Sequence, residues 1–185
     1  MDIPLKDLQY VTSLEEIVWG GALVAVTMAM HGFGMLTVVR SHGALKERFE
    51  KTPSFTVGLT VLIISSWMIL FFHLLEVFAW AGFFLWKGAV HTGDPNVAAN
   101  SSLCYYFALL DYTCLGSNYN LKPSWRLLEG AIAMAGLLTF AWSTGVLMTL
   151  AQDFQDTQMQ LLKQKRAKRH PKPATSPPPT PTQSQ

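Results

Sequence analysis

The sequence predicts an all-α membrane protein with three transmembrane helices, and two observations support this fold class. Half of the 185 residues are hydrophobic and only 14% are charged, with a mean hydropathy of +0.23. Residues 17–39 and 130–150 contain no Asp, Glu, Lys or Arg, and residues 57–86 are interrupted only by His73 and Glu76. About 20 apolar residues cross the hydrocarbon core of a bilayer. We therefore expect the lipid bilayer to surround the chain, and we expect no nucleic-acid partner.

Residues 1–16 form a polar N-terminal segment that does not resemble a cleavable signal. The segment carries one basic residue, Lys6, and four acidic residues: Asp2, Asp7, Glu15 and Glu16. Signal peptides begin with a basic region, so we expect residues 17–39 to be retained as the first transmembrane helix. This helix has no ladder of Arg or Lys, and a voltage-sensing role is not predicted.

The distribution of basic residues predicts the orientation. Ten of the fourteen Lys and Arg residues lie in the 40–56 loop and in the chain after residue 150. Three transmembrane helices place both segments on one side, and cytoplasmic flanks collect Lys and Arg. The N-terminus is therefore expected outside and the C-terminus in the cytoplasm. Residues 153–170 predict a cytoplasmic helical extension, and residues 171–185, rich in Pro, Thr and Ser, predict a disordered tail.

A shorter apolar segment lies between the second and third helices, at residues 101–119. Its first 16 residues, SSLCYYFALLDYTCLG, are too few to cross a bilayer comfortably. We expect a re-entrant helix and a loop, because bare backbone at membrane depth is tolerated where it lines water or binds ions. An ordinary outer loop with an interfacial helix is the alternative. Cys104 and Cys114 fall on this helix and its exit, and their spacing argues against a disulfide between them.

This pattern resembles the pore domain of the potassium channel family, particularly small prokaryotic ion channel proteins with a two-helix pore domain. The resemblance rests on YFALLDYTCLG, on WRLLEGAIAMAGLLTFAWSTG and on the HLLE and WA motifs of the second helix. It covers residues 57–152, and implies an outer helix at 57–86, a pore helix and filter at about 101–119, and an inner helix at about 127–150.

The resemblance also implies a function and a location. The expected function is passive conduction of K⁺ or another monovalent cation across a bacterial inner (plasma) membrane. No enzymatic activity, no cofactor and no metal beyond the permeating cation are expected. One pore loop cannot surround an ion, so a homotetramer is expected.

The predicted ion-coordinating filter consists of Thr113, Cys114, Leu115, Gly116, Ser117 and Asn118. Family members commonly read Thr-Thr-Val/Leu-Gly-Tyr-Gly-Asp here. Cys114, Ser117, Asn118 and Tyr119 depart from that pattern. A filter of this type requires left-handed backbone at alternate residues. Gly116 adopts this conformation readily, and Asn118, which tolerates it, occupies the position of the second glycine. The departures also suit an alternative function, a nonconducting membrane scaffold or regulatory subunit derived from a channel.

Other residues are expected to support the filter or to bend the inner helix. The predicted filter supports are Asp111, Tyr112, His73, Glu76 and Trp80. The last three share one face of the second helix, whereas simple exposure is an equal alternative for Asp111. Gly136 is the predicted hinge of the third helix, although ordinary packing of small residues explains the same composition.

His31 in the first helix is flanked by Gly32 and Gly34. A close helix contact is its expected role, and a proton path is the alternative. A third interpretation of the chain makes His31, His73 and Glu76 the metal ligands of a membrane enzyme. Catalytic metal sites usually have a tighter ligand set, such as a Glu-x-x-His pair with further ligands, so we do not expect this site.

Overall fold

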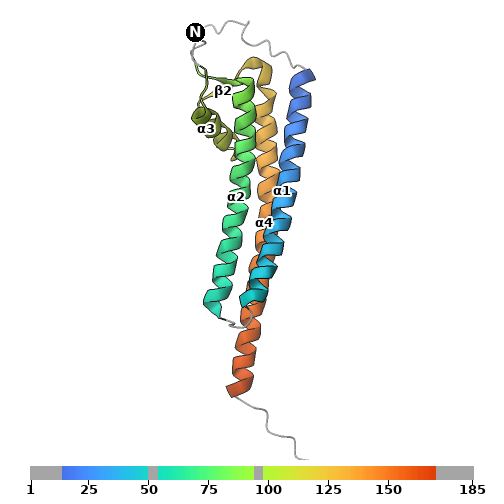
Figure 1. The fold of residues 1–185 in the computed structure, drawn as a ribbon, viewed down its shortest axis with the longest axis vertical. Coiled ribbons are helices and arrows are strands. Elements are labelled where there is room, and N and C mark those ends of the chain that lie inside the picture. The colour runs from blue at the N-terminus through green and yellow to red at the C-terminus, as the bar shows by residue number, and fades with distance from the viewer. Residues whose placement is uncertain (1–13, 50–53, 94–97, 170–185) are drawn as a thin grey trace, which may run out of the picture.

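Three long helices stand side by side in the computed structural model, which describes residues 14–49, 54–93 and 98–169. These helices are α1 (Leu14–Phe49), α2 (Phe55–Lys87) and α4 (Leu127–Arg169). The shorter elements are β1 (Val90–His91), α3 (Ser101–Tyr112), β2 (Asn120–Leu121) and the 3₁₀ turn η2 (Pro123–Trp125). α1 and α4 run in one direction and α2 runs in the other (Figure 1). α3 lies beside α2, at the end of the bundle where α1 and α4 begin.

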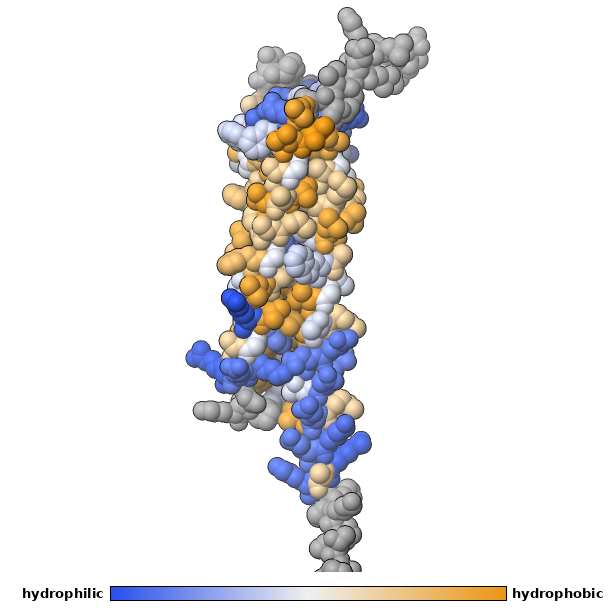
Figure 2. Space-filling view, turned by 90° about the vertical axis from the view of Figure 1, so that its right-hand side faces the viewer, coloured by the Kyte–Doolittle hydropathy of each residue, from blue (hydrophilic) through white to orange (hydrophobic). Residues whose placement is uncertain are grey.

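By length and apolar composition, α1, α2 and α4 are able to cross a membrane. Many of their large apolar side chains are exposed on the outside of the bundle. Figure 2 shows hydrophobic residues along the upper and middle part of one face, with hydrophilic residues gathered toward its lower end. Apolar surface of this extent is stable when lipid covers it. The prediction of three helices long and apolar enough to cross a membrane is confirmed.

The helices extend beyond the predicted spans. α1 stays helical to Phe49, so most of the basic residues assigned to the 40–56 loop lie on a helix instead. α4 is one helix that includes both the predicted inner helix and the extension at 153–170, ending at Arg169. Residues 152–169 contain no Gly or Pro to interrupt it. The predicted tail at 171–185 and most of the segment at 1–16 lie outside the described residues.

α3 is held against α2 and α4 by an apolar core at this end of the bundle. The side chain of Asn100 accepts a hydrogen bond from the Leu103 N–H at 2.8 Å, which caps the start of the helix. The largest buried core side chains are Trp80, Phe84, Phe107, Tyr112, Leu128 and Ile132. Cys104 is buried in this core while Cys114 is exposed, and both are free thiols, as their spacing predicts.

Gly136 marks the closest approach of α3 to α4. A Cβ built on Gly136 would overlap the carbonyl oxygen of Tyr112, the last residue of α3. The absence of a side chain therefore lets the end of α3 rest directly on the α4 backbone. This contact gives Gly136 a packing role, and its role as a hinge stays a prediction.

We expect Gly136→Ala to destabilise the protein by about 1–3 kcal/mol, because the added methyl group has to displace backbone and cannot move into free space. The measurement is the unfolding midpoint of the purified protein in detergent. Gly130→Ala is the matched control on the same helix, since a Cβ there meets no atom within 4 Å. Equal midpoints for the two variants would contradict the close contact.

Candidate functional site

The loop that follows α3 starts with a helix C-cap of the Schellman type. The Cys114 N–H donates to the Asp111 carbonyl at 3.0 Å, and the Leu115 N–H donates to the Leu110 carbonyl at 2.9 Å. Cys114 takes the left-handed position that glycine usually fills in this motif, with φ of 59°. Gly116 is also left-handed, with φ of 72°. The left-handed backbone thus occurs at alternate residues of the predicted filter.

Asn118 differs from expectation. In the described part of the chain Cys114 is the one non-glycine residue with positive φ, so Asn118 does not take the predicted left-handed conformation. Hydrogen bonds at the end of α3 impose the left-handed conformation four residues earlier, at Cys114. The hydroxyl of Ser117 donates to the Tyr119 carbonyl at 2.7 Å and accepts from the Tyr119 N–H at 2.9 Å, which closes a local turn.

Most of the predicted filter is exposed in the single chain. Leu115 is 76% exposed, although it is a large apolar residue. Cys114, Gly116 and Asn118 are exposed as well. The loop therefore presents its residues outward, where an ion, a lipid or another chain can reach them.

Tyr112, directly before this loop, is anchored in a buried polar network. Its side chain is 1% exposed, and its hydroxyl donates to the carboxylate of Glu76 on α2. The same hydroxyl lies 2.5 Å from Oγ1 of Thr139 on α4 and 3.3 Å from Nδ1 of His73. The end of α3 is thus tied to both neighbouring helices.

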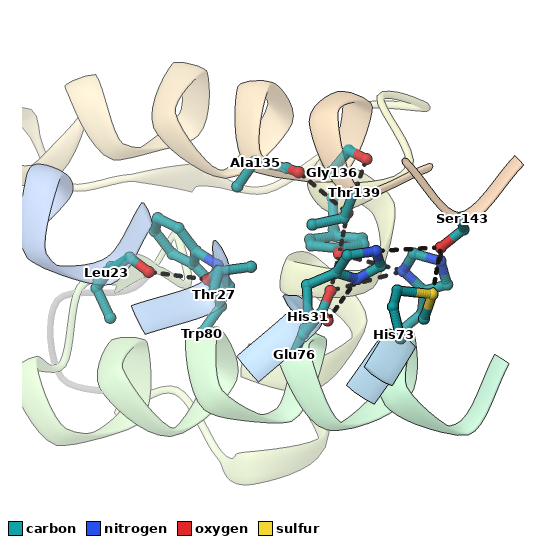
Figure 3. A network of polar contacts seen from close by, with 12 residues as sticks. Leu23, Thr27, His31, His73, Glu76, Trp80, Ala135, Gly136, Thr139 and Ser143 are labelled. Carbon is teal, nitrogen blue, oxygen red and sulfur yellow. Dashed lines mark hydrogen bonds and ion pairs between the residues drawn. The ribbon is translucent and has the colours of Figure 1, made fainter. Parts of the chain in front are cut away.

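α1 completes this network with His31. The Nδ1 atom of His31 lies 2.9 Å from Oε1 of Glu76, and Oγ of Ser143 lies between Nε2 of His31 at 3.3 Å and Nε2 of His73 at 2.9 Å (Figure 3). A carboxylate only accepts, so Nδ1 of His31 carries the hydrogen. With both imidazoles neutral, His73 donates to Ser143, Ser143 donates to His31, and His31 donates to Glu76.

The structure brings together some predicted support residues and separates others. His73, Glu76 and Tyr112 meet in the network. Trp80 instead donates its indole N–H to Thr27 of α1 at 2.9 Å, while its ring lies in the core around α3. Asp111 makes no side-chain contact with the network. It faces a cavity beside Glu129, and burial together with the Glu129 charge raises its pKa to about 6.

Three residues were not identified from the sequence: Thr139 and Ser143, which belong to the network, and Thr27, which is the partner of Trp80. A signal was present, because Thr27 and His31, and likewise Thr139 and Ser143, lie four residues apart on apolar helices. Two polar groups at this spacing share one helix face. Such a face is expected to find polar partners inside the bundle.

The cluster of His31, His73 and Glu76 also has the composition of a metal site. One ligand atom from each lies within 4.8 Å of the other two, and imidazole with carboxylate suits zinc or iron. Within the described residues, however, no buried side-chain nitrogen or oxygen lacks a hydrogen-bond partner. The groups satisfy one another through the network, so their burial needs no metal to explain it.

Comparisons with known proteins give no further identification. No protein-family model matches the chain, no curated protein matches it, and no solved structure matches it. The functional argument therefore depends on the residues and their geometry.

We expect Tyr112→Phe to lower the free energy of unfolding by about 1–3 kcal/mol, because removing the hydroxyl takes a donor from the buried Glu76 carboxylate. Chemical denaturation in detergent measures this loss. Tyr106→Phe on the same helix is the matched control, since Tyr106 is 49% exposed. The network would not hold α3 if both variants unfolded like the unmodified protein.

Proposed function

We propose that the chain is one quarter of a tetrameric channel that conducts monovalent cations passively. The observation that carries the proposal is the exposed loop after α3, with left-handed backbone at Cys114 and Gly116. Left-handed residues at alternate positions allow successive carbonyls to face one axis. Carbonyls arranged in this way replace the water around a permeating ion. Thr113 to Ser117, with Asn118 nearby, are the proposed ion-coordinating residues.

The placement of α3 supports this proposal. α3 is a 12-residue helix that packs on α2 and α4 near one end of the bundle, as a re-entrant pore helix would. A filter requires its backbone to be held within a fraction of an ångström. The bonds from Tyr112 to Glu76 and Thr139 supply such a support at the residue where α3 ends.

Exposed apolar surface favours assembly. Leu115 in the loop and Met134, Leu137 and Leu138 on α4 are more than half exposed. Four copies around an axis would cover the part of this surface that faces the neighbouring chains, and lipid would cover the rest. A single loop offers carbonyls from one side of an ion, and four loops surround it.

The proposed orientation places the α3 end of the bundle outside and the opposite end in the cytoplasm. The last turns of α1 and α4 carry Lys46, Arg48, Arg166, Lys168 and Arg169. Cytoplasmic flanks collect such residues, and both of these helix ends point the same way. The resemblance to prokaryotic channels favours a bacterial plasma membrane. In this proposal the chain needs no cofactor and catalyses no reaction.

A second candidate is a nonconducting scaffold or regulatory subunit derived from a channel. The observation that favours it is the set of local hydrogen bonds that close the loop, at Cys114, Leu115 and Ser117. These bonds account for the loop conformation without an ion. In this second candidate the end of α3 serves packing alone.

We expect the purified protein in liposomes to carry a K⁺ flux that Gly116→Ala reduces at least tenfold. Alanine at φ of 72° is strained by about 1–2 kcal/mol, which disfavours the proposed filter backbone. Gly82→Ala is the control, because Gly82 is exposed on α2 and a Cβ there meets no atom within 4 Å. Mass determination in detergent is expected to give four chains. Folded tetramers that carry no K⁺ flux would refute conduction.

A filter with the family's residues separates the two candidates. The substitutions are Cys114→Thr, Ser117→Tyr, Asn118→Gly and Tyr119→Asp in one chain. A channel is expected to conduct before and after the changes and to move its reversal potential toward that of potassium. A scaffold is expected to conduct only after them. Planar bilayers under a potassium-to-sodium gradient measure both outcomes.

A further inference from the structure

A cavity of about 290 Å³ lies between the loop after α3 and the start of α4. Asp111 lines it from α3 and Glu129 lines it from α4. Ser117 and Asn120 add side-chain oxygens from the loop and from β2. We propose that this cavity binds a divalent cation, with Ca²⁺ as the ion that its oxygen ligands fit best.

Asp111 provides the first argument. It is 9% exposed, and the described part of the chain offers its carboxylate no hydrogen-bond donor. Every fully buried side-chain oxygen in that part of the chain has a hydrogen-bond partner. The unpartnered oxygens of Asp111 are therefore not fully buried. They therefore open into the cavity that Asp111 lines. A carboxylate in such a place is costly unless a positive charge joins it.

The position of Asp111 on α3 strengthens this argument. Asp111 is the second-last residue of the helix, where the helix dipole is negative and opposes a carboxylate. Burial and the charge of Glu129 both raise its pKa, to about 6. A bound cation would offset all three unfavourable effects.

Glu129 provides the second carboxylate in a fixed position. Its Oε1 accepts a hydrogen bond from the Leu121 N–H at 2.7 Å, which leaves Oε2 available. Among the described residues, no Lys or Arg lines the cavity. Two carboxylates match the charge of a divalent ion. The thiol of Cys114 is directed at the Ala133 carbonyl, 3.7 Å away, so the ligands that remain are oxygens.

The chemistry of the ligands favours Ca²⁺. Calcium takes six to eight oxygen ligands at about 2.3–2.6 Å in flexible geometry, and magnesium requires a smaller, regular octahedron. The cavity offers carboxylate, hydroxyl and amide oxygens and has room for water to complete the shell. This site is lined by the loop together with α3 and α4, and cation binding there does not require the chain to conduct ions.

Cys114 reports on the site directly. It lines the cavity and is exposed, whereas the other cysteine, Cys104, is buried. The experiment uses the full chain in detergent, stripped of divalent ions, and measures the rate at which a charged thiol reagent modifies Cys114. We expect CaCl₂ to slow this rate at least threefold with a saturable midpoint, and MgCl₂ or KCl at the same concentration to have less effect.

Two variants test the ligands, and a third is the control. Asp111→Asn and Glu129→Gln are expected to raise the Ca²⁺ midpoint at least tenfold, and Gln keeps an acceptor for Leu121 N–H. Asp156→Asn, an exposed acid near the other end of α4, is the control and is expected to leave the midpoint unchanged. An equal response to Ca²⁺ in all three variants, or no response in the unmodified protein, would overturn the site.

A Cys114→Ser variant removes the reporter and tests whether the thiol is a ligand. A rise in thermal unfolding temperature with CaCl₂ is expected to persist in Cys114→Ser and to vanish in Asp111→Asn. Loss of the rise in Cys114→Ser would overturn the all-oxygen site.

Discussion

The buried carboxylate of Glu76 is the group on which the arrangement of the helices depends. A carboxylate removed from water costs several kcal/mol unless donors surround it. α2 alone cannot supply them, so they come from His31 of α1 and Tyr112 of α3, and Tyr112 in turn contacts α4 through Thr139. Each helix must therefore present one particular face toward Glu76. Apolar packing tolerates small rotations of a helix, whereas a hydrogen bond to a buried charge tolerates few.

This constraint changes the role expected for the first helix. The sequence places residues 17–39 outside a pore domain, yet α1 supplies His31 to the network and Thr27 to Trp80. Glu16 of α1 also accepts a hydrogen bond from the Leu127 N–H at the start of α4. A carboxylate at a helix N-terminus satisfies a free donor and the dipole together. α1 is thus a structural part of the unit that holds α3.

The sequence predicts the coarse fold well, because crossing a bilayer requires a length of apolar chain that is visible in composition. The end of α1 beyond its apolar span carries no such signal, which is why α1 runs past its predicted limit, whereas helix-forming residues at 153–170 predict the extension of α4. Periodicity places His73 and Glu76 on one face but does not reveal that His31 lies opposite. The left-handed residue at Cys114 depends on hydrogen bonds to Leu110 and Asp111 at the end of a helix. Residue preference alone predicts the left-handed conformation at Asn118 instead.

The continuity of α4 has a mechanical consequence. Its 43 residues measure about 65 Å at 1.5 Å per residue, roughly twice the thickness of the hydrocarbon core, about 30 Å. One continuous helix therefore connects Gly136, on which the end of α3 rests, to basic residues well past the length that spans a bilayer. A binding partner that displaced or twisted that basic end would transmit the movement along the helix. The movement would arrive at the backbone contact between Gly136 and Tyr112, one residue before the loop begins.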